Sequence, residues 1–363
     1  MRMLVSIGLL AASAAAAEPF SEAEVRAILA HGPWPTPISA DPTNRASGKR
    51  AAIELGEKLF FDTRLSASGK FSCGTCHVPE RNWTDNLVRG RAASDVERNT
   101  PTLMNVRLGR WFGWGGAADS LWSQSLRPIL DARELGASPR HVAALVRSDE
   151  QMACRYRRTF GEPPGADDDE VLVGVAKALA AFQETFESPP TPFDRFRNAL
   201  ARGEKSTYSD AAQRGLRTFV AHCSSCHSGP NFTNGEFHDN GFSSRGRADA
   251  GRTEGVKVHG ASRFNLQGRF NDDARVQRAV LPVGDSPKFK VPTLRHLMLT
   301  APYGHHGEFE TLAEVIRHYS ERGSAEIKPL RLSAAQQTDL VVFLESISTL
   351  SNPWRPEDHA HCR

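Results

Sequence analysis

The sequence of 363 residues carries almost no net charge, since 45 Lys and Arg side chains stand against 42 Asp and Glu and leave a formal charge of +3 at neutral pH. It also lacks any run of basic residues with interleaved aromatics, which is the pattern of a chain that follows a nucleic-acid backbone. The charge pattern therefore gives no reason to expect a nucleic-acid partner.

Long apolar runs are missing too, with one exception at the N-terminus. Residues 4–12 are apolar, but the stretch is too short to cross a bilayer. The basic Arg2 precedes it and small alanines at 15–17 follow it, an order that is typical of a secretory signal. We therefore predict a signal peptide over 1–17, a mature chain that begins at Glu18, a periplasmic location and no insertion into the membrane.

Alternating apolar and polar residues, the pattern of a half-buried strand, are scarce. Helical spacing of apolar residues is common instead, most clearly from about Asp168 to Phe186 and in a segment that opens at Ser333. The first segment has acidic residues at its start, and Ser333 is a good N-cap. The fold is therefore expected to be mainly helical.

Cysteine is rare, but four of the six cysteines stand in two copies of one pentapeptide. The copies are Cys73-Gly74-Thr75-Cys76-His77 and Cys223-Ser224-Ser225-Cys226-His227. In a C-x-x-C-H run the thiols add to the vinyl groups of one haem, and the adjacent His binds the iron. Zinc knuckles or disulfides are the alternative, but a zinc site would leave both histidines without a purpose. We therefore predict two covalently bound haem c groups, with His77 and His227 as iron ligands.

Cys154 and Cys362 remain outside these motifs. In an oxidising compartment such a pair can form a disulfide, which would hold the C-terminal tail against the first half of the chain. Two separate thiols are the alternative, and the sequence leaves the choice open.

A repeat orders the chain into two parts. A short helical pattern with Gly56 and Phe60 precedes the first motif, and one with Gly215 and Phe219 precedes the second. An amphipathic helix closes each part, which is the layout of a cytochrome c domain. With the Pro-rich stretch 188–192 as linker, we predict a mainly α fold of two cytochrome c-like domains, each with one haem, over 18–187 and 188–363.

Two points stay open at this level. The polar segment 241–268, rich in Gly and Arg, reads either as a mobile loop or as a segment that wraps the second haem. Met298 is the candidate second ligand of that haem from the residues alone, because a thioether is the usual partner of His in an electron-transfer cytochrome.

Further motifs resemble the bacterial dihaem cytochrome c peroxidases together with their MauG branch. The match covers nearly the whole mature chain, with the motifs in the right order. They are Gly56-x-x-x-Phe60-Phe61-Asp62-x-Arg64-Leu65-Ser66, Arg98-Asn99-Thr100-Pro101-Thr102, Trp114 with Ser120-Leu121, Val291-Pro292-Thr293-Leu294-Arg295, and Thr300-Ala301-Pro302-Tyr303 with His305.

The resemblance implies an open face on the first haem. The peroxidases of the family carry a distal His between the first haem motif and the Arg-Asn-Thr-Pro motif, but residues 83–98 contain no histidine. By the same match Glu134 moves the proton, Gln124 positions peroxide and Pro128 covers the ring. Composition alone would make Glu134 a surface residue in a loop.

For the second haem the resemblance replaces Met298 by Tyr319, the ligand type of MauG. On this helix a core aromatic is the alternative reading of Tyr319. Trp114 is placed between the two haems, where an indole would split one long tunnelling step into shorter ones. The sequence departs from the family at Trp114-Gly115-Gly116-Ala117, where Trp-Asp-Gly-Arg is usual, and at His306, where Asp is usual.

The resemblance also implies a calcium ion held by Asn99, Thr300 and Pro302, since oxygen ligands suit a hard cation. The implied function is a dihaem peroxidase that reacts with hydrogen peroxide at the first haem and shares the oxidising equivalents with the second. Its electrons would come from a donor such as a small cytochrome c or a cupredoxin. The alternatives are a MauG-like enzyme that oxidises Trp or Tyr residues of a partner protein, and a dihaem electron carrier without catalysis.

Overall fold

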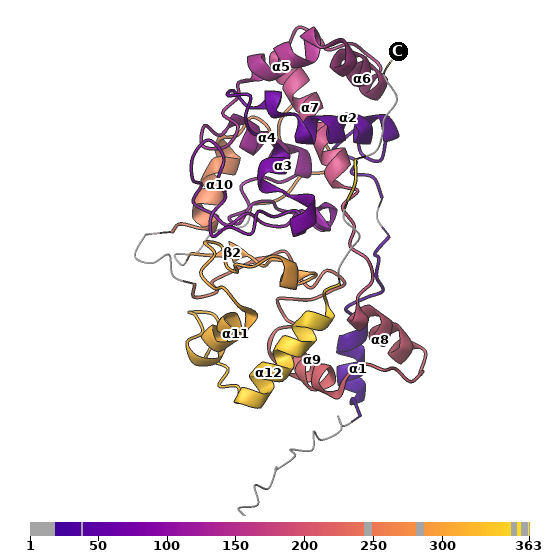
Figure 1. Ribbon diagram of the computed structural model, residues 1–363, viewed down its shortest axis with the longest axis vertical. Coiled ribbons are helices and arrows are strands. Elements are labelled where there is room, and N and C mark those ends of the chain that lie inside the picture. The colour runs from indigo at the N-terminus through magenta and orange to yellow at the C-terminus, as the bar shows by residue number, and fades with distance from the viewer. Residues whose placement is uncertain are drawn as a thin grey trace, which may run out of the picture.

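The computed structural model describes residues 19–37, 39–242, 249–280, 287–349, 354–356 and 362, so the predicted signal peptide lies outside the described residues. Figure 1 shows two helical lobes stacked along the long axis, with β2 between them. Among the described residues the only named strands are β1 (Phe237–His238) and β2 (Phe289–Lys290), which pair antiparallel. The prediction of a mainly helical fold is confirmed.

The helices of the first half are α1 (Glu22–Leu29), α2 (Arg50–Phe61), α3 (Cys73–Cys76), α4 (Leu121–Leu130), α5 (Pro139–Ser148), α6 (Glu150–Phe160) and α7 (Asp168–Gln183). Those of the second half are α8 (Pro192–Ala201), α9 (Asp210–His222), α10 (Arg252–Ala261), α11 (Leu312–Glu321) and α12 (Ala334–Ser346). Short 3-10 helices include η3 (Val106–Leu108) and η4 (Leu297–Leu299). Within the described part of the chain, no helix is long and apolar enough to span a bilayer.

Both predicted closing helices, α7 and α12, begin close to the residues at which the sequence predicts them, Asp168 and Ser333. The Asp167 side chain caps α7 by accepting from the backbone amides of Asp169 and Glu170, and the helix ends at Gln183, slightly before the expected Phe186. Ser333 caps α12 in a reciprocal bond with Gln336. Acceptors at these positions satisfy amides that the first helical turn leaves without partners.

Each closing helix packs on the helix before a haem motif through a glycine. A Cβ on Gly56 of α2 would lie 2.0 Å from the carbonyl oxygen of Ala178 in α7. A Cβ on Gly215 of α9 would lie 1.9 Å from the carbonyl oxygen of Asp339 in α12. The missing side chain thus allows the two backbones of each pair to touch, and the sequence repeat is a repeated helix pair.

The repeat continues in the loops. An isolated antiparallel bridge joins Phe112 to Ala118, and an equally spaced one joins Tyr303 to Phe309. Each bridge follows a 3-10 turn (η3 or η4) and precedes a ten-residue helix (α4 or α11). Positions in α4 and α11 can therefore be compared one by one.

Two segments pack across the predicted boundary at 187/188, which stays a prediction. Helix α1 contacts α8 and α9, and Phe264, Leu266 and Phe270 belong to the core of the first half. Helix α10 is fixed there by a fully buried contact of 2.9 Å between His259 and Asp119. Of the segment 241–268 that the sequence left open, Phe242 lies beside Tyr319 in the second half and 243–248 lie outside the described residues. His259, Phe264 and Leu266 pack against the first half.

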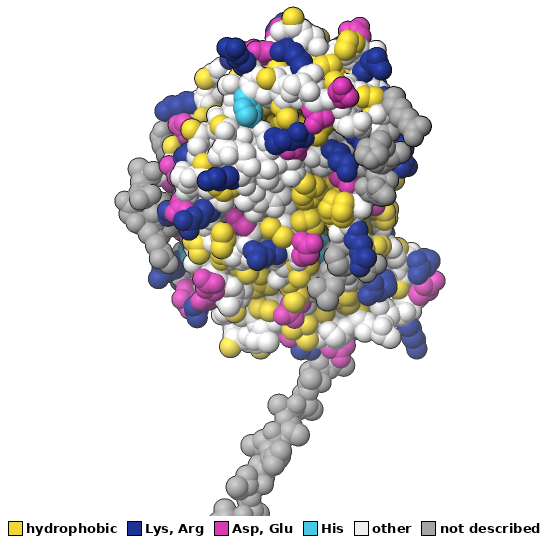
Figure 2. Space-filling view, turned by 45° about the horizontal axis from the view of Figure 1, so that its top comes forward, with side chains coloured by type: hydrophobic (Ala, Val, Ile, Leu, Met, Phe, Trp, Pro, Cys, Tyr) yellow, Lys and Arg dark blue, Asp and Glu magenta, His cyan; other side chains and the backbone are white. Residues whose placement is uncertain are grey.

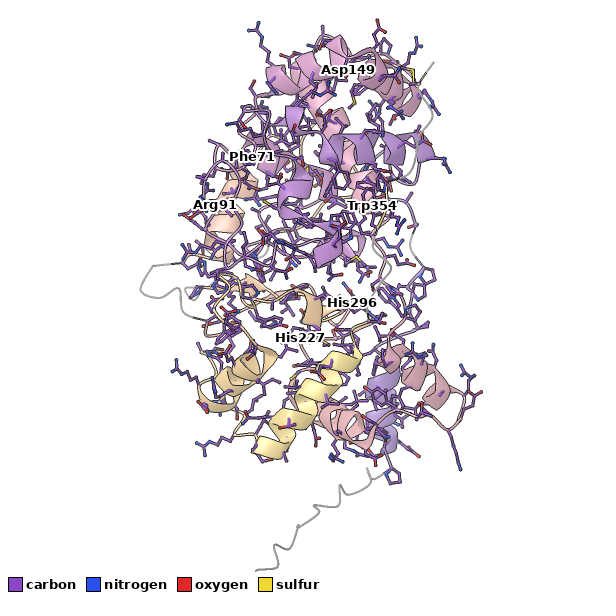
Figure 3. All side chains as sticks on the ribbon, in the orientation of Figure 1. Phe71, Arg91, Asp149, His227, His296 and Trp354 are labelled. Carbon is purple, nitrogen blue, oxygen red and sulfur yellow. A yellow bond between two sulfur atoms is a disulfide. The ribbon has the colours of Figure 1, made fainter. Side chains whose placement is uncertain are left out.

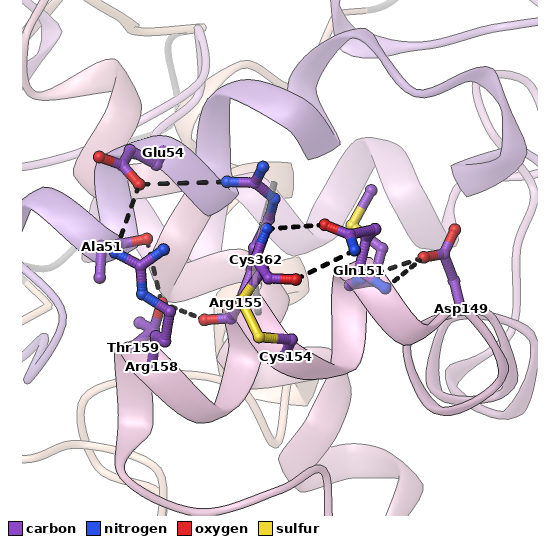
Figure 4. Close-up of a disulfide and its surroundings, with 10 residues drawn as sticks. Ala51, Glu54, Asp149, Gln151, Cys154, Arg155, Arg158, Thr159 and Cys362 are labelled. Atoms are coloured by element: carbon purple, nitrogen blue, oxygen red, sulfur yellow. Dashed lines mark hydrogen bonds and ion pairs between the residues drawn. A yellow bond between two sulfur atoms is a disulfide. The ribbon is translucent and has the colours of Figure 1, made fainter. Parts of the chain in front are cut away.

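Cys154 of α6 and Cys362 form a disulfide, which decides the question that the sequence left open. Figure 4 shows Gln151 beside it, whose side chain bonds both backbone groups of Cys362, at 2.9 and 3.1 Å. The C-terminal tail is therefore held against the first half.

Acidic and basic side chains are interspersed over the face seen in Figure 2.

Candidate functional site

The first C-x-x-C-H motif forms the short helix α3 and the residue after it. The hydroxyl of Thr75 accepts a hydrogen bond from the backbone amide of Ser72, which fixes the start of the turn. Nδ1 of His77 lies 2.9 Å from the carbonyl oxygen of Trp83. Because a carbonyl only accepts, Nδ1 carries the proton and Nε2 keeps its lone pair for a metal.

The second motif repeats this arrangement. Nδ1 of His227 lies 3.1 Å from the carbonyl oxygen of Phe232. Burial lowers the pKa of His227 to about 4 and also lowers the pKa of His77, so both imidazoles are neutral at pH 7. A neutral imidazole with a free Nε2 is the form that binds haem iron.

The four motif cysteines are free thiols. Burial raises the pKa of Cys73 and Cys223 to about 12, so these thiols are protonated at pH 7. The cluster of three potential metal-binding side chains found among the described residues is Asp249, His305 and His306, and it contains no motif cysteine. The residues at both motifs therefore fit a covalently attached haem and do not form a zinc knuckle.

Gln124, Pro128 and Glu134 come from α4 and the turn that follows it. Two backbone bonds fold this turn, from Leu135 to Pro128 (3.0 Å) and from Glu134 to Asp131 (2.9 Å). The carboxylate of Glu134 raises the pKa of both Cys73 and Cys76, which places it beside the first motif.

Burial raises the pKa of Glu134 itself, and the neighbouring Asp131 adds to this effect. A half-buried carboxyl with a raised pKa keeps its proton to higher pH than an exposed one and can take part in acid–base chemistry. Composition alone favoured a surface position for Glu134, but in the structure this residue is only partly exposed.

The sequence interpretation missed Arg127. Its guanidinium Nη1 donates to Oε1 of Gln124 over 3.2 Å, and its charge partly offsets the raised pKa of Glu134. Burial lowers the pKa of Arg127. The available signal was helical spacing, because a residue three positions after Gln124 lies on the same face of α4.

Tyr319 lies in α11 at the position that Pro128 has in α4, since each is the eighth residue of its helix. Burial raises the pKa of its phenol, and the thiols of Cys223 and Cys226 raise it further, so Tyr319 lies beside the second motif. The alternative ligand Met298 is 47% exposed on η4. The geometry therefore favours Tyr319 over Met298.

Trp114 lies where the two halves meet. Its indole Nε1 donates to the carbonyl oxygen of Asn99 (2.9 Å), and its own carbonyl accepts from the amide of Lys290 in β2 (2.9 Å). The ring centroid is 6.3 Å from that of His305. Where the sequence lacks the family's charged pair, the guanidinium of Arg252 donates to the carbonyls of Gly115 and Gly116.

The three predicted calcium ligands, Asn99, Thr300 and Pro302, lie close to one segment of the chain, residues 86–87. The side-chain amide of Asn99 donates to the carbonyl of Leu87 (2.8 Å). The neighbouring Asn86 donates to the carbonyls of Leu299 (3.2 Å) and Ala301 (2.9 Å), directly beside Thr300 and Pro302. These contacts bring Asn99 and residues 299–302 to the same segment, 86–87.

A polar cluster surrounds His306, the second departure from the family. Its Nε2 lies 2.7 Å from Asp249, whose carboxylate also accepts from Arg98. His305 is fully buried, and among the described residues neither ring nitrogen has a hydrogen-bond partner. Burial lowers the pKa of His305 to about 3, so it is neutral. A carboxylate is thus still present here, supplied by Asp249.

Comparisons with known proteins identify relatives of this chain. A family model described as di-haem cytochrome c peroxidase matches residues 50–202. The methylamine utilization protein MauG of Methylorubrum extorquens is 34% identical over 92% of this chain and 88% of its own length. Cytochrome-c peroxidase IdrP1 of Pseudomonas sp. strain SCT is 29% identical over 98% and 95%. The crystal structure of a MauG-like protein associated with microbial copper homeostasis has a TM-score of 0.66 and 24% identity, over 87% of this chain and 95% of that one.

Proposed function

Since the chain belongs to the family of dihaem cytochrome c peroxidases and MauG, we propose that it reduces hydrogen peroxide at the haem held by Cys73, Cys76 and His77. The second haem, held by Cys223, Cys226 and His227 with Tyr319 as its other ligand, would share the oxidising equivalents. The overall reaction takes one peroxide, two protons and two electrons to two waters.

One observation carries the proposal, namely that Pro128 and Tyr319 occupy the same position in equivalent helices. Tyr319 offers a phenol oxygen that can bind iron. Pro128 has no donor atom in its side chain, so the first haem has no ligand from that position. The same difference argues against a pure electron carrier, in which the iron of each haem would have two protein ligands.

The bound haem supplies the iron at which peroxide is reduced, and the protein supplies proton control. Glu134 takes a proton from incoming peroxide and returns it to the leaving oxygen. Gln124 orients the peroxide, and Arg127 fixes the amide of Gln124 through their hydrogen bond. Pro128 shields this face without binding to it.

Further parts of the proposal follow from the same family membership. The donor would be a small cytochrome c or a cupredoxin. Trp114 would carry electrons between the halves, and a calcium ion bound by Asn99, Thr300 and Pro302 would hold the interface around it. The N-terminal sequence supports export to the periplasm.

A second candidate function is MauG-like oxidation of a partner protein, which the 34% identity to MauG favours. At the end of α9, beside the second haem motif, the exposed residues are Ala221 and His222. No indole stands there to pass oxidising equivalents to a docked protein. We therefore place peroxide reduction first.

The experiment that tests this proposal introduces a protein ligand at the open face of the first haem. A Pro128→Met variant would place a thioether where α11 carries Tyr319, and Leu130→Met on the same helix is the control, because Leu130 points to solvent at 36% exposure. We expect Pro128→Met to convert the high-spin ferric signal to low spin and to lose peroxide consumption, while Leu130→Met retains both. If Pro128→Met stays high spin and consumes peroxide like the parent, Pro128 does not cover the reactive haem.

A further inference from the structure

We propose that Trp83 and Trp354 form a second electron path, which connects the His77 haem site to a surface cavity that binds a small uncharged aromatic reductant such as a hydroquinone. The inference rests on the proposed peroxidase function and adds a donor site to it. It is separate from Trp114, which lies between the two halves.

Trp83 is linked directly to the first haem motif. Its carbonyl oxygen accepts the hydrogen bond from Nδ1 of His77, and its side chain is only 4% exposed. The indole stacks on Phe186 with a centroid distance of 3.7 Å. The hydrogen bond ends on the backbone of Trp83, so its buried indole belongs to the residue that holds the iron ligand in place. An indole there can pass an electron to that site but cannot itself meet a donor from solution.

Trp354 extends this contact to the surface. Its ring centroid is 5.7 Å from that of Trp83 and 4.9 Å from that of Phe61, on which it stacks. The side chain is half-buried. Rings in van der Waals contact divide a long electron-tunnelling distance into two short steps, and indoles are among the side chains most easily oxidised by one electron.

The tail places Trp354 there from the other end of the chain. Figure 3 shows Trp354 on the side of the upper lobe, although the chain enters this stretch from α12 in the lower lobe. The disulfide of Cys362 with Cys154 fixes the tail beyond it. Trp354 packs there against the hydrophobic core of the first half.

A cavity of about 420 Å³ opens at Trp354. This lies within the usual size range for a small-molecule site. Phe61, Met152, Trp354 and Pro356 give it apolar surface. Its charged lining residues are Glu57, Lys58, Asp62 and Arg64.

Basic and acidic side chains balance around the cavity, with Lys58 and Arg64 against Glu57 and Asp62. The guanidinium of Arg64 bonds Asp62 at 2.6 Å and Asp149 at 2.9 Å. The cavity therefore offers stacking surfaces and hydrogen-bonding groups rather than a field of one sign. This chemistry suits an uncharged ring with hydroxyl groups better than the charged surface of a carrier protein.

The electron balance is complete with this donor. Each hydroquinone loses one electron and one proton and becomes a semiquinone radical. The electron passes to Trp354, then to Trp83 and then to the His77 site. Two such events reduce one hydrogen peroxide to two waters, and the two released protons are consumed in that step.

The first test compares donors in the holoprotein. We expect Trp354→Phe to lower kcat/KM for hydroquinone about tenfold, because the path and one wall of the cavity are lost. Turnover with a small cytochrome c as donor should stay unchanged. Trp111→Phe is the matched control, since Trp111 is 9% exposed and its ring packs against His259 and Arg252, away from the proposed path.

The second test does not depend on turnover. After peroxide treatment without a donor, peptide mass spectrometry should find oxygen added to Trp354 in the parent protein, and less of it when hydroquinone is present. Trp83→Phe should suppress oxidation at Trp354, and its haem spectrum shows whether the first site is intact.

Unchanged hydroquinone turnover in Trp354→Phe, or an unmodified Trp354 in a protein that does consume peroxide, overturns the electron path alone. If the holoprotein consumes no peroxide with any donor, the proposed function itself fails. The two failures are thus distinguishable.

Discussion

At the scale of single residues, Glu134 is the group to which the proposed mechanism assigns proton transfer. Burial raises its pKa, so it retains a proton to higher pH than an ordinary Glu, whose pKa is about 4.3. Only the carboxylate can accept the proton of peroxide. Peroxide reduction should therefore increase as the pH rises through the raised pKa of Glu134.

A Glu134→Gln variant removes this base. We expect kcat/KM for peroxide to fall at least ~100-fold, the usual contribution of a general acid–base group, and the acidic limb of the pH profile to disappear. Glu97→Gln, an exposed acid of the same first half, is the control and should change neither. A variant that keeps the parent's rate and pH profile would show that Glu134 does not move the proton.

Tyr319 is the second residue on which the proposal depends, as the proposed ligand of the second haem. A phenolate stabilises ferric iron and a thioether stabilises ferrous iron. We therefore expect Tyr319→Met to raise the reduction potential of the second haem by on the order of 100 mV, a part of the ~0.8 V range that axial ligands span. Spectroelectrochemical titration measures both haems, and Tyr303→Phe serves as control. An unchanged potential would mean that Tyr319 is not a ligand.

Sequence and family resemblance predicted most residues of the candidate site at this scale. The haem motifs are local in sequence, and Gln124, Pro128 and Glu134 lie close together because one helix and one turn carry them. Arg127 was missed because an arginine before a proline looks like a solvated side chain. Only the tertiary packing of α4 shows that it is buried and bonded to Gln124.

At the scale of elements, the glycines of α2 and α9 allow the close packing of the helix pairs. Gly56→Ala and Gly215→Ala would push a methyl group into a backbone carbonyl that cannot move without separating the helices. We expect each to lower the free energy of unfolding by about 2–3 kcal/mol. Gly260→Ala in α10 is the control, because its Cβ would meet nothing within 4 Å, and it should be neutral or stabilising by up to ~1 kcal/mol.

Denaturant unfolding of the three variants measures these differences. Equal stability of Gly215→Ala and Gly260→Ala would contradict the close contact of α9 with α12. The helix pairs themselves were predictable from spacing and caps. Helix α10 was not, because its sequence is rich in Gly and Arg, and it is held by tertiary contacts such as His259 with Asp119.

At the scale of the whole molecule, the two halves are tied together by the disulfide and by two segments that pack across the predicted boundary, α1 and residues 259–270. Cys154 and Cys362 are separated by 208 positions, so their bond closes a loop that includes the whole second half. Sequence could pair these cysteines only by elimination. It could not show that α1 and residues 259–270 pack across the expected boundary, since such contacts depend on the complete fold.

A Cys154→Ser/Cys362→Ser double variant removes this closure. We expect it to lose about 2–4 kcal/mol of unfolding free energy, because the unfolded chain gains freedom. The parent protein under reducing conditions is the matched control and should approach the stability of the double variant. Equal stability of the oxidised parent and the double variant would show that the tail adds nothing to the fold.

The central claim is that the first haem is open in the resting, fully ferric protein and that the second shares its oxidising equivalents. The most direct measurement is the optical and EPR response of the ferric two-haem protein to one equivalent of hydrogen peroxide without reductant. We predict prompt loss of the high-spin ferric signal and a new near-infrared band that both haems share. A ferric protein that stays inert, and reacts only after one haem has been reduced, would contradict the account by revealing a sixth ligand on the first haem.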